Sequence, residues 1–108
     1  MATQNNVNNI DFRITNNVHI LHININGLFG RKTELIHYLN ECTPHLVTLN
    51  ETKLRNQTKI KIPNYHLIRR DRATNGGGVA ILVRKDLKYN EIDTSEFNEE
   101  FLAIRITR

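Results

Sequence analysis

The sequence predicts a mixed α/β (α+β) fold, and three segments carry this prediction. Residues 18–25 form a β-branched, nearly continuous apolar run that stops at Asn26-Gly27, as a buried strand that ends in a turn does. Residues 31–42 place apolar side chains on one face at helical spacing. Residues 46–49 form a second short apolar run. A strand, a helix and a strand, with a helix long enough for a crossover, predict two parallel neighbouring strands.

The remaining elements follow in chain order. Pro44 lies just beyond the helix, where helices usually stop. Residues 55–64 are polar and basic and are expected to form an exposed connection. A third strand is expected at Tyr65–Ile68, and a hairpin with a glycine tip (Gly76–Gly78) before a strand at Val79–Val83. A last strand is expected from Phe101 to the last residue, Arg108, and it lacks a neighbouring strand to pair with.

Composition limits the class of protein. The chain has 108 residues, 39% of them hydrophobic, which is enough for one small domain, and no apolar run is long enough to span a membrane. The single cysteine, Cys42, excludes an internal disulfide and a cysteine-rich zinc site, so a reducing, intracellular setting is expected. Residues 1–17 form an Asn-rich lead-in that is expected to be flexible, and residues 18–108 form the domain. The net charge of +4 favours a polyanionic partner.

Polar side chains follow the two strands that are expected to be parallel neighbours. Asn24 and Asn26 lie at the end of the first apolar run, and Glu51 lies just past the second. Their oxygens could converge at one edge of the sheet, where a carboxylate with a nearby amide would suit Mg²⁺ that also contacts a phosphate. The alternative is that Glu51 is a solvated strand end.

A group of arginines follows the third strand. Arg69, Arg70 and Arg72 could form a ridge that faces phosphates, because guanidinium groups pair with phosphate oxygens in a bidentate way. The alternative is a solvated charge cluster in which Asp71 pairs locally. The histidines match no zinc spacing, and no nucleophile and base pair of the hydrolase kind is recognisable.

Taken together, several segments resemble a known family. Residues 21–28 (LHININGL) and 44–54 (PHLVTLNETKL) resemble the opening of the endonuclease/exonuclease/phosphatase superfamily. Tyr65, residues 70–72 (RDR) and residues 76–83 (GGGVAILV) are similar to the apurinic-type endonuclease domain of non-LTR retrotransposons of the jockey kind. The resemblance covers about residues 18–106.

The resemblance implies a metal-dependent phosphodiesterase that nicks one DNA strand at a target site, so that the reverse transcriptase of the element can prime from the 3′ hydroxyl. It implies that Asn24 and Glu51 are the catalytic and metal-binding residues, with Mg²⁺ as the cofactor and Mn²⁺ as a substitute. Asn26, Arg70 and Arg72 are expected to contact DNA. The implied partners are DNA and a reverse transcriptase domain in the same polyprotein, with no membrane, and the implied location is the nucleus.

The resemblance also implies that the chain is incomplete. The family fold is a four-layer α/β-sandwich, two packed β-sheets flanked by helices, and only its N-terminal half is present, without the Asp-x-Asn and terminal Asp-His pairs. The fragment is therefore expected to be inactive alone, and its unpaired strand and uncovered sheet face are expected to favour aggregation. Three alternatives remain: a small basic nucleic-acid-binding module without catalysis, a relative that acts on a phospholipid or inositol phosphate, and a non-functional transposon relic.

Overall fold

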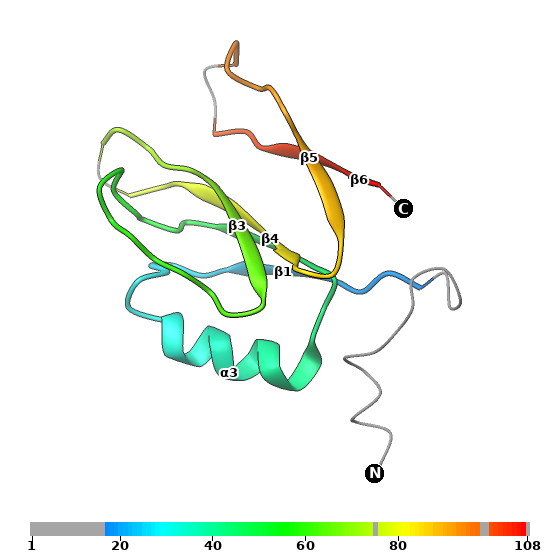
Figure 1. Cartoon of the computed structure of the whole chain (residues 1–108). Coiled ribbons are helices and arrows are strands. Elements are labelled where there is room, and N and C mark those ends of the chain that lie inside the picture. Colours follow the sequence, from blue (N-terminus) through cyan, green and yellow to red (C-terminus); the bar gives the residue numbers. More distant parts are fainter. Residues whose placement is uncertain (1–16, 75, 98–99, 108) are drawn as a thin grey trace.

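The fold is described from a computed structural model, which defines residues 17–74, 76–97 and 100–107. The predicted lead-in lies outside these residues except for Asn17. The elements, in chain order, are β1 (Ile20–Asn24), α3 (Lys32–Cys42), β2 (Leu46–Asn50), β3 (Tyr65–Arg70), β4 (Val79–Arg84), β5 (Lys88–Ile92) and β6 (Ala103–Thr107) (Figure 1). The predicted mixed α/β class is confirmed.

Four of these strands form the main sheet, in the order β1-β2-β4-β3. β1 and β2 are parallel neighbours, as predicted, with α3 as the crossover between them. β3 and β4 form the predicted antiparallel hairpin, and β4 also pairs antiparallel with β2. The helix ends in a left-handed cap at Thr43, whose N–H donates to the carbonyl of Leu39, so the chain leaves the helix directly before Pro44.

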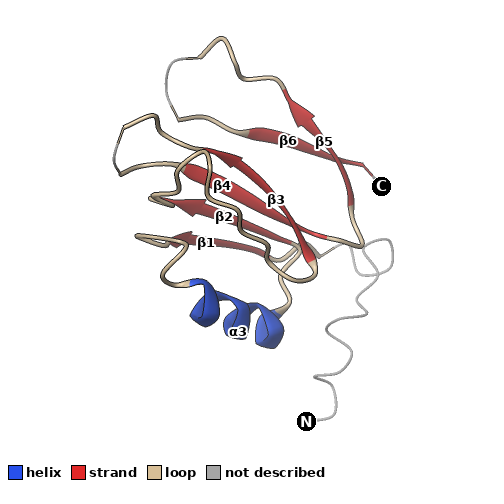
Figure 2. Ribbon diagram, turned by 60° about the vertical axis from the view of Figure 1, so that its left-hand side comes forward, coloured by secondary structure: helices blue, strands red, loops and turns tan. Residues whose placement is uncertain are grey.

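The two faces of the main sheet are covered by different elements (Figure 2). One face packs against α3, where Leu35 and Leu39 join Val47, Leu49 and Leu82 in the buried core. The opposite face is covered by β5 and β6 only near β3, where the ring of His66 lies 5.5 Å from that of Tyr89. Near β1 this face is open, and Ile20 is 62% exposed. Within the described residues, no helix is long and apolar enough to cross a membrane.

Three features of the fold differ from the sequence prediction. The last strand, β6, was expected to lack a neighbour but pairs antiparallel with β5. β5 was not predicted, because its five residues (KYNEI) are mostly polar and exposed, and it is held by pairing with β6 more than by burial. The connection over residues 55–64 is not wholly exposed, since Ile62 is only 3% exposed and packs in the core. Ile60 also packs against the core, but two apolar residues in a polar stretch are too few to give a periodic signal.

Candidate metal and phosphate site

The predicted polar residues of β1 and β2 meet at one edge of the main sheet. Asn24 ends β1 and lies opposite Asn50, which ends β2. The backbone pairing continues beyond both strands, because the N–H of Gly27 donates to the carbonyl of Glu51 (2.8 Å) and the N–H of Leu28 donates to that of Thr52 (2.9 Å). The structure therefore places Asn24, Asn26 and Glu51 on adjacent, hydrogen-bonded segments.

The backbone at this edge adopts left-handed conformations that side chains disfavour. The φ angles are +48° at Asn26, +58° at Glu51 and +54° at Lys53. A non-glycine residue in this region costs about 1–2 kcal/mol. Bonds from the next strand offset this cost, since the N–H groups of Thr52 and Lys53 donate to the carbonyls of Gly78 (3.1 Å) and Gly77 (2.7 Å). Strain of this kind, maintained by surrounding bonds, is typical of functional sites.

The oxygen atoms at this edge fit a hard cation that retains several waters. Glu51 is half-buried, and its carboxylate has no hydrogen-bond or ion-pair partner within the described part of the chain. The side-chain oxygen of Asn50 is buried and also lacks a partner there. One carboxylate with amide oxygens from Asn24 and Asn50 is a donor set that Mg²⁺ accepts and that zinc does not prefer. No group of three His, Cys, Asp or Glu side chains gathers among the described residues, so this set would hold a metal from one side only.

A polar cleft lies directly after Glu51 along the chain. Its cavity of about 300 Å³ is lined by Lys53, Arg55 and Arg72, together with uncharged residues that include Asn56 and Gln57. Three of its described lining residues are cations and none is acidic. A cleft of this kind suits a phosphodiester backbone better than a neutral ligand.

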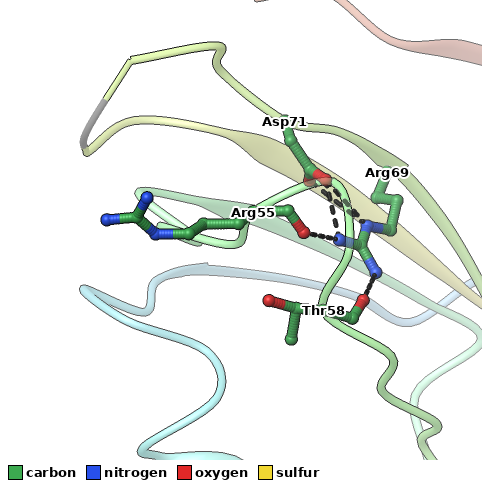
Figure 3. Close-up of polar contacts among 4 residues, drawn as sticks. All are labelled: Arg55, Thr58, Arg69 and Asp71. Carbon is green, nitrogen blue, oxygen red and sulfur yellow. Dashed lines mark hydrogen bonds and ion pairs between the residues drawn. The ribbon is translucent and has the colours of Figure 1, made fainter.

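One ion pair fixes the loop that forms this cleft (Figure 3). The guanidinium of Arg69 donates to the carboxylate of Asp71 at 2.7 Å, and the Asp71 side chain is only 4% exposed. The same guanidinium donates to the carbonyls of Thr58 and Arg55, both at 2.7 Å. The side chain of Arg55 points away from this pair. Asp71 therefore pairs locally, the alternative considered from the sequence, and Arg69 holds the loop in place.

The other two arginines of the predicted ridge have different environments. The guanidinium of Arg70 donates to the carbonyls of Thr94, Phe97 and Phe101, at 3.0, 2.7 and 3.2 Å, so it holds the segment between β5 and β6. Arg72 is 47% exposed, lines the cleft and pairs with Glu100. The structure thus brings Arg72 beside the cleft, whereas Arg69 and Arg70 are engaged in holding loops. DNA contacts by Asn26, Arg70 and Arg72 remain predictions.

Several residues of this edge were not singled out from the sequence. Asn50 was noted only in its motif, because its significance depends on the register that sets it opposite Asn24. Lys53 and Arg55 follow Glu51 at intervals of two, a spacing that could have indicated side chains on the same side of an extended segment. Glu100 is 22 residues from its backbone partner Gly78, and nothing local indicates that contact.

In this α/β domain, a parallel strand pair therefore ends in amide and carboxylate oxygens beside a cationic cleft. The chain belongs to the Endonuclease/Exonuclease/phosphatase family, whose model matches residues 21–102. No curated protein sequence matches it.

Two solved structures show the same fold. An AP endonuclease from Archaeoglobus fulgidus is 25% identical, with a TM-score of 0.57 over 83% of this chain and 37% of that one. The 3′ phosphatase NExo (D146N) from Neisseria, bound to a product DNA hairpin, is 20% identical, with a TM-score of 0.60 over 84% of this chain and 38% of that one. This chain therefore spans less than two fifths of the length of either structure.

Proposed function

We propose that this chain supplies the metal-binding and part of the phosphate-binding surface of a Mg²⁺-dependent endonuclease that hydrolyses DNA phosphodiesters. The observation that carries the proposal is the unpaired Glu51 carboxylate, held in a left-handed turn by backbone bonds from two neighbouring segments. The similarity to an AP endonuclease, a DNA-processing enzyme, supports DNA as the substrate class.

Each residue at this edge has a distinct part in the proposed chemistry. Glu51 would hold the metal, with the amide oxygens of Asn24 and Asn50 orienting its water ligands or a phosphate oxygen. When bound, Mg²⁺ would polarise the scissile phosphate and neutralise charge that develops during hydrolysis. Lys53, Arg55 and Arg72 would bind the flanking backbone phosphates and keep the strand in register with the metal.

In this proposal, catalysis requires residues in addition to those of this chain. Among the described residues, no three His, Cys, Asp or Glu side chains gather in a group that could hold a metal. Activation of the attacking water requires a base, so we infer that these 108 residues bind metal and DNA but do not nick DNA alone.

The test separates metal binding from DNA binding. Mn²⁺ is titrated into the chain while paramagnetic broadening of the backbone amide signals is followed by NMR. We expect selective broadening around residues 24–27 and 50–53, and an affinity at least tenfold weaker in Glu51→Gln. Glu34→Gln, on an exposed position of α3, is the matched control and should bind as the wild type does. Uniform or absent broadening, or wild-type affinity in Glu51→Gln, would overturn the metal site.

The cleft favours a second candidate function, a nucleic-acid-binding module without catalysis. A fluorescent DNA duplex, titrated by anisotropy at several salt concentrations, distinguishes the two. For the module, binding weakens with salt and with Lys53→Gln and Arg55→Gln, but is unaffected by Mg²⁺ and by Glu51→Gln. For the endonuclease, Mg²⁺ strengthens binding, and Glu51→Gln removes that increment.

We further propose that the endonuclease is that of a jockey-like non-LTR retrotransposon, which acts in the nucleus with a reverse transcriptase of the same polyprotein. The support is the sequence of residues 65–83. Genomic and transcript sequence beyond the codon of Arg108 tests this directly: an in-frame Asp-x-Asn, a terminal Asp-His and a polymerase are expected, and a stop codon would instead indicate a relic.

A further inference from the structure

Glu100, which lies between β5 and β6, connects the second sheet to the glycine turn before β4. One carboxylate oxygen accepts from the guanidinium of Arg72, and the other accepts from the N–H of Gly78, all at 2.6 Å. The residue is half-buried, with a side-chain exposure of 26%. A charged acceptor on a backbone N–H is a strong hydrogen bond, and here the ion pair orients it.

The two glycines that Glu100 contacts are closely enclosed. Gly77 and Gly78 have φ angles of +64° and +93°. A Cβ at Gly77 would collide with the Arg72 guanidinium and the Glu100 carboxylate, and a Cβ at Gly78 would collide with the Thr52 hydroxyl. The glycine backbone is therefore held between the Arg72–Glu100 pair on one side and the segment after Glu51 on the other.

The contacts of these glycines lead to the metal-binding edge. The carbonyls of Gly77 and Gly78 accept the N–H groups of Lys53 and Thr52. The carbonyls of Glu51 and Thr52 in turn accept the N–H groups of Gly27 and Leu28. These bonds connect Glu100, through two glycine peptide groups, to the turn in which Glu51 has its φ of +58°.

We propose that Glu100 is a positioning residue, which fixes the Gly77–Gly78 peptides and through them the turn that presents the Glu51 carboxylate. The inference rests on the proposed function, because it assigns Glu100 a part in the same metal-binding edge. Glu100 itself does not ligate the metal.

The first test concerns the backbone and needs no metal. In Glu100→Gln, the acceptor for Gly78 is neutral and the ion pair with Arg72 is lost. We expect amide hydrogen exchange to accelerate at least tenfold at Thr52, Lys53 and Gly78, with the amides of α3 unchanged. Glu96→Gln, an exposed position in the same connection, is the matched control and should leave all of these amides unchanged. Wild-type exchange in Glu100→Gln would overturn the proposal.

The second test concerns the metal. Positioning residues of a metal ligand typically change affinity by about 10–100-fold, so we expect Mn²⁺ affinity to fall by about tenfold in Glu100→Gln, with no change in the unfolding midpoint of the main sheet. Arg72→Gln leaves the hydrogen bond between Gly78 and Glu100 in place, so it should lower the Mn²⁺ affinity less than Glu100→Gln does. If Glu100→Gln does not fold, the Mn²⁺ affinity of Arg72→Gln is measured in its place. Suppose that the wild type binds Mn²⁺, that Glu51→Gln does not, and that Glu100→Gln binds it with wild-type affinity. This inference then fails and the proposed function stands. If Mn²⁺ does not bind the wild type, the proposed function fails as well.

Discussion

The two ends of the main sheet differ in whether their charged side chains are paired. At the closed end, where β1 and β2 begin, the Tyr65 hydroxyl donates to the carbonyl of Pro44 (2.6 Å) and the N–H of His19 donates to Nδ1 of the buried His45 (3.0 Å). The buried Arg84 guanidinium donates to Asp86 (2.7 Å) and to the Thr43 carbonyl (2.8 Å), which joins β4 to the end of α3.

At the open end, where β1 and β2 finish, the polar groups are left without such partners. The carboxylate of Glu51 and the buried oxygen of Asn50 have none among the described residues, and the backbone at Asn26 and Glu51 is left-handed. Both ends have a left-handed backbone and a buried side-chain oxygen without a partner, that of Thr43 at the closed end and that of Asn50 at the open end. The difference between the ends therefore lies in the charged groups, because Arg84 and Asp86 are paired whereas the Glu51 carboxylate has no partner among the described residues.

The pKa shifts of two side chains at the closed end are consistent with this pairing. Burial, reinforced by the nearby Arg84 charge, lowers the pKa of His45, so its ring is neutral at neutral pH and Nδ1 can accept a hydrogen bond. The hydrogen bond from Arg84 lowers the pKa of Asp86 and keeps that carboxylate charged. Both shifts maintain the hydrogen bonds that the closed end already has.

The largest effect on stability is expected at Arg84. Arg84→Met removes the bonds to Asp86 and to the Thr43 carbonyl while keeping most of the apolar volume. We expect a loss of about 2–3 kcal/mol in the free energy of unfolding, measured in urea, because a buried carbonyl is left without its donor. Arg105→Met, at an exposed position of β6, should change it by less than about 0.5 kcal/mol. If the two substitutions lower the free energy of unfolding equally, the paired charged groups of the closed end do not stabilise the fold more than an exposed arginine does.

The next effect is a loss of stability at alkaline pH that depends on Tyr65. Burial raises the pKa of Tyr65 from 10.0 to about 12, so the folded state favours the neutral phenol. The resulting stability is fully present below pH 10.0, the unfolded value, and is lost as the pH rises through about 12. At 1.36 kcal/mol for each pKa unit, we expect a total loss of about 2–3 kcal/mol.

Tyr65→Phe provides the control for this pH dependence. It should be less stable by about 1 kcal/mol at neutral pH, because the Pro44 carbonyl loses its donor. It should also lack the part of the alkaline loss that Tyr65 causes. If the wild type and Tyr65→Phe lose stability in parallel between pH 10 and 12, the assignment to Tyr65 is wrong.

The sequence predicted the parts of the fold that depend on local pattern. The strand at residues 18–25, the helix before Pro44 and the glycine-tipped hairpin were all readable from periodicity and turn chemistry. β5 was missed because pairing, and not apolar spacing, holds it.

The candidate site was predictable only in part. Parallel pairing of β1 with β2 was enough to bring Asn24 and Glu51 to one edge. The roles of the arginines were not readable, because Arg69, Arg70 and Arg72 are nearly adjacent in sequence but have different partners: Arg69 holds the loop at residues 55–58, whereas Arg70 and Arg72 contact the connection between β5 and β6. Contacts between residues 11 to 31 positions apart decide those roles, and no spacing rule encodes them.

The smallest effect, and one of opposite sign, is expected at the open end. Glu51→Gly relieves a left-handed residue, worth about 1–2 kcal/mol, but increases the freedom of the unfolded chain by about 0.4–1 kcal/mol. We therefore expect a gain of about 0.5–1 kcal/mol in the free energy of unfolding, together with loss of Mn²⁺ binding. Glu34→Gly, the same exchange in the exposed face of α3, should instead cost about 1 kcal/mol. A gain at residue 51 beside a cost at residue 34 would mean that the fold sacrifices stability to present this carboxylate. A cost at both positions would mean that the turn is relaxed and that Glu51 is an ordinary strand end.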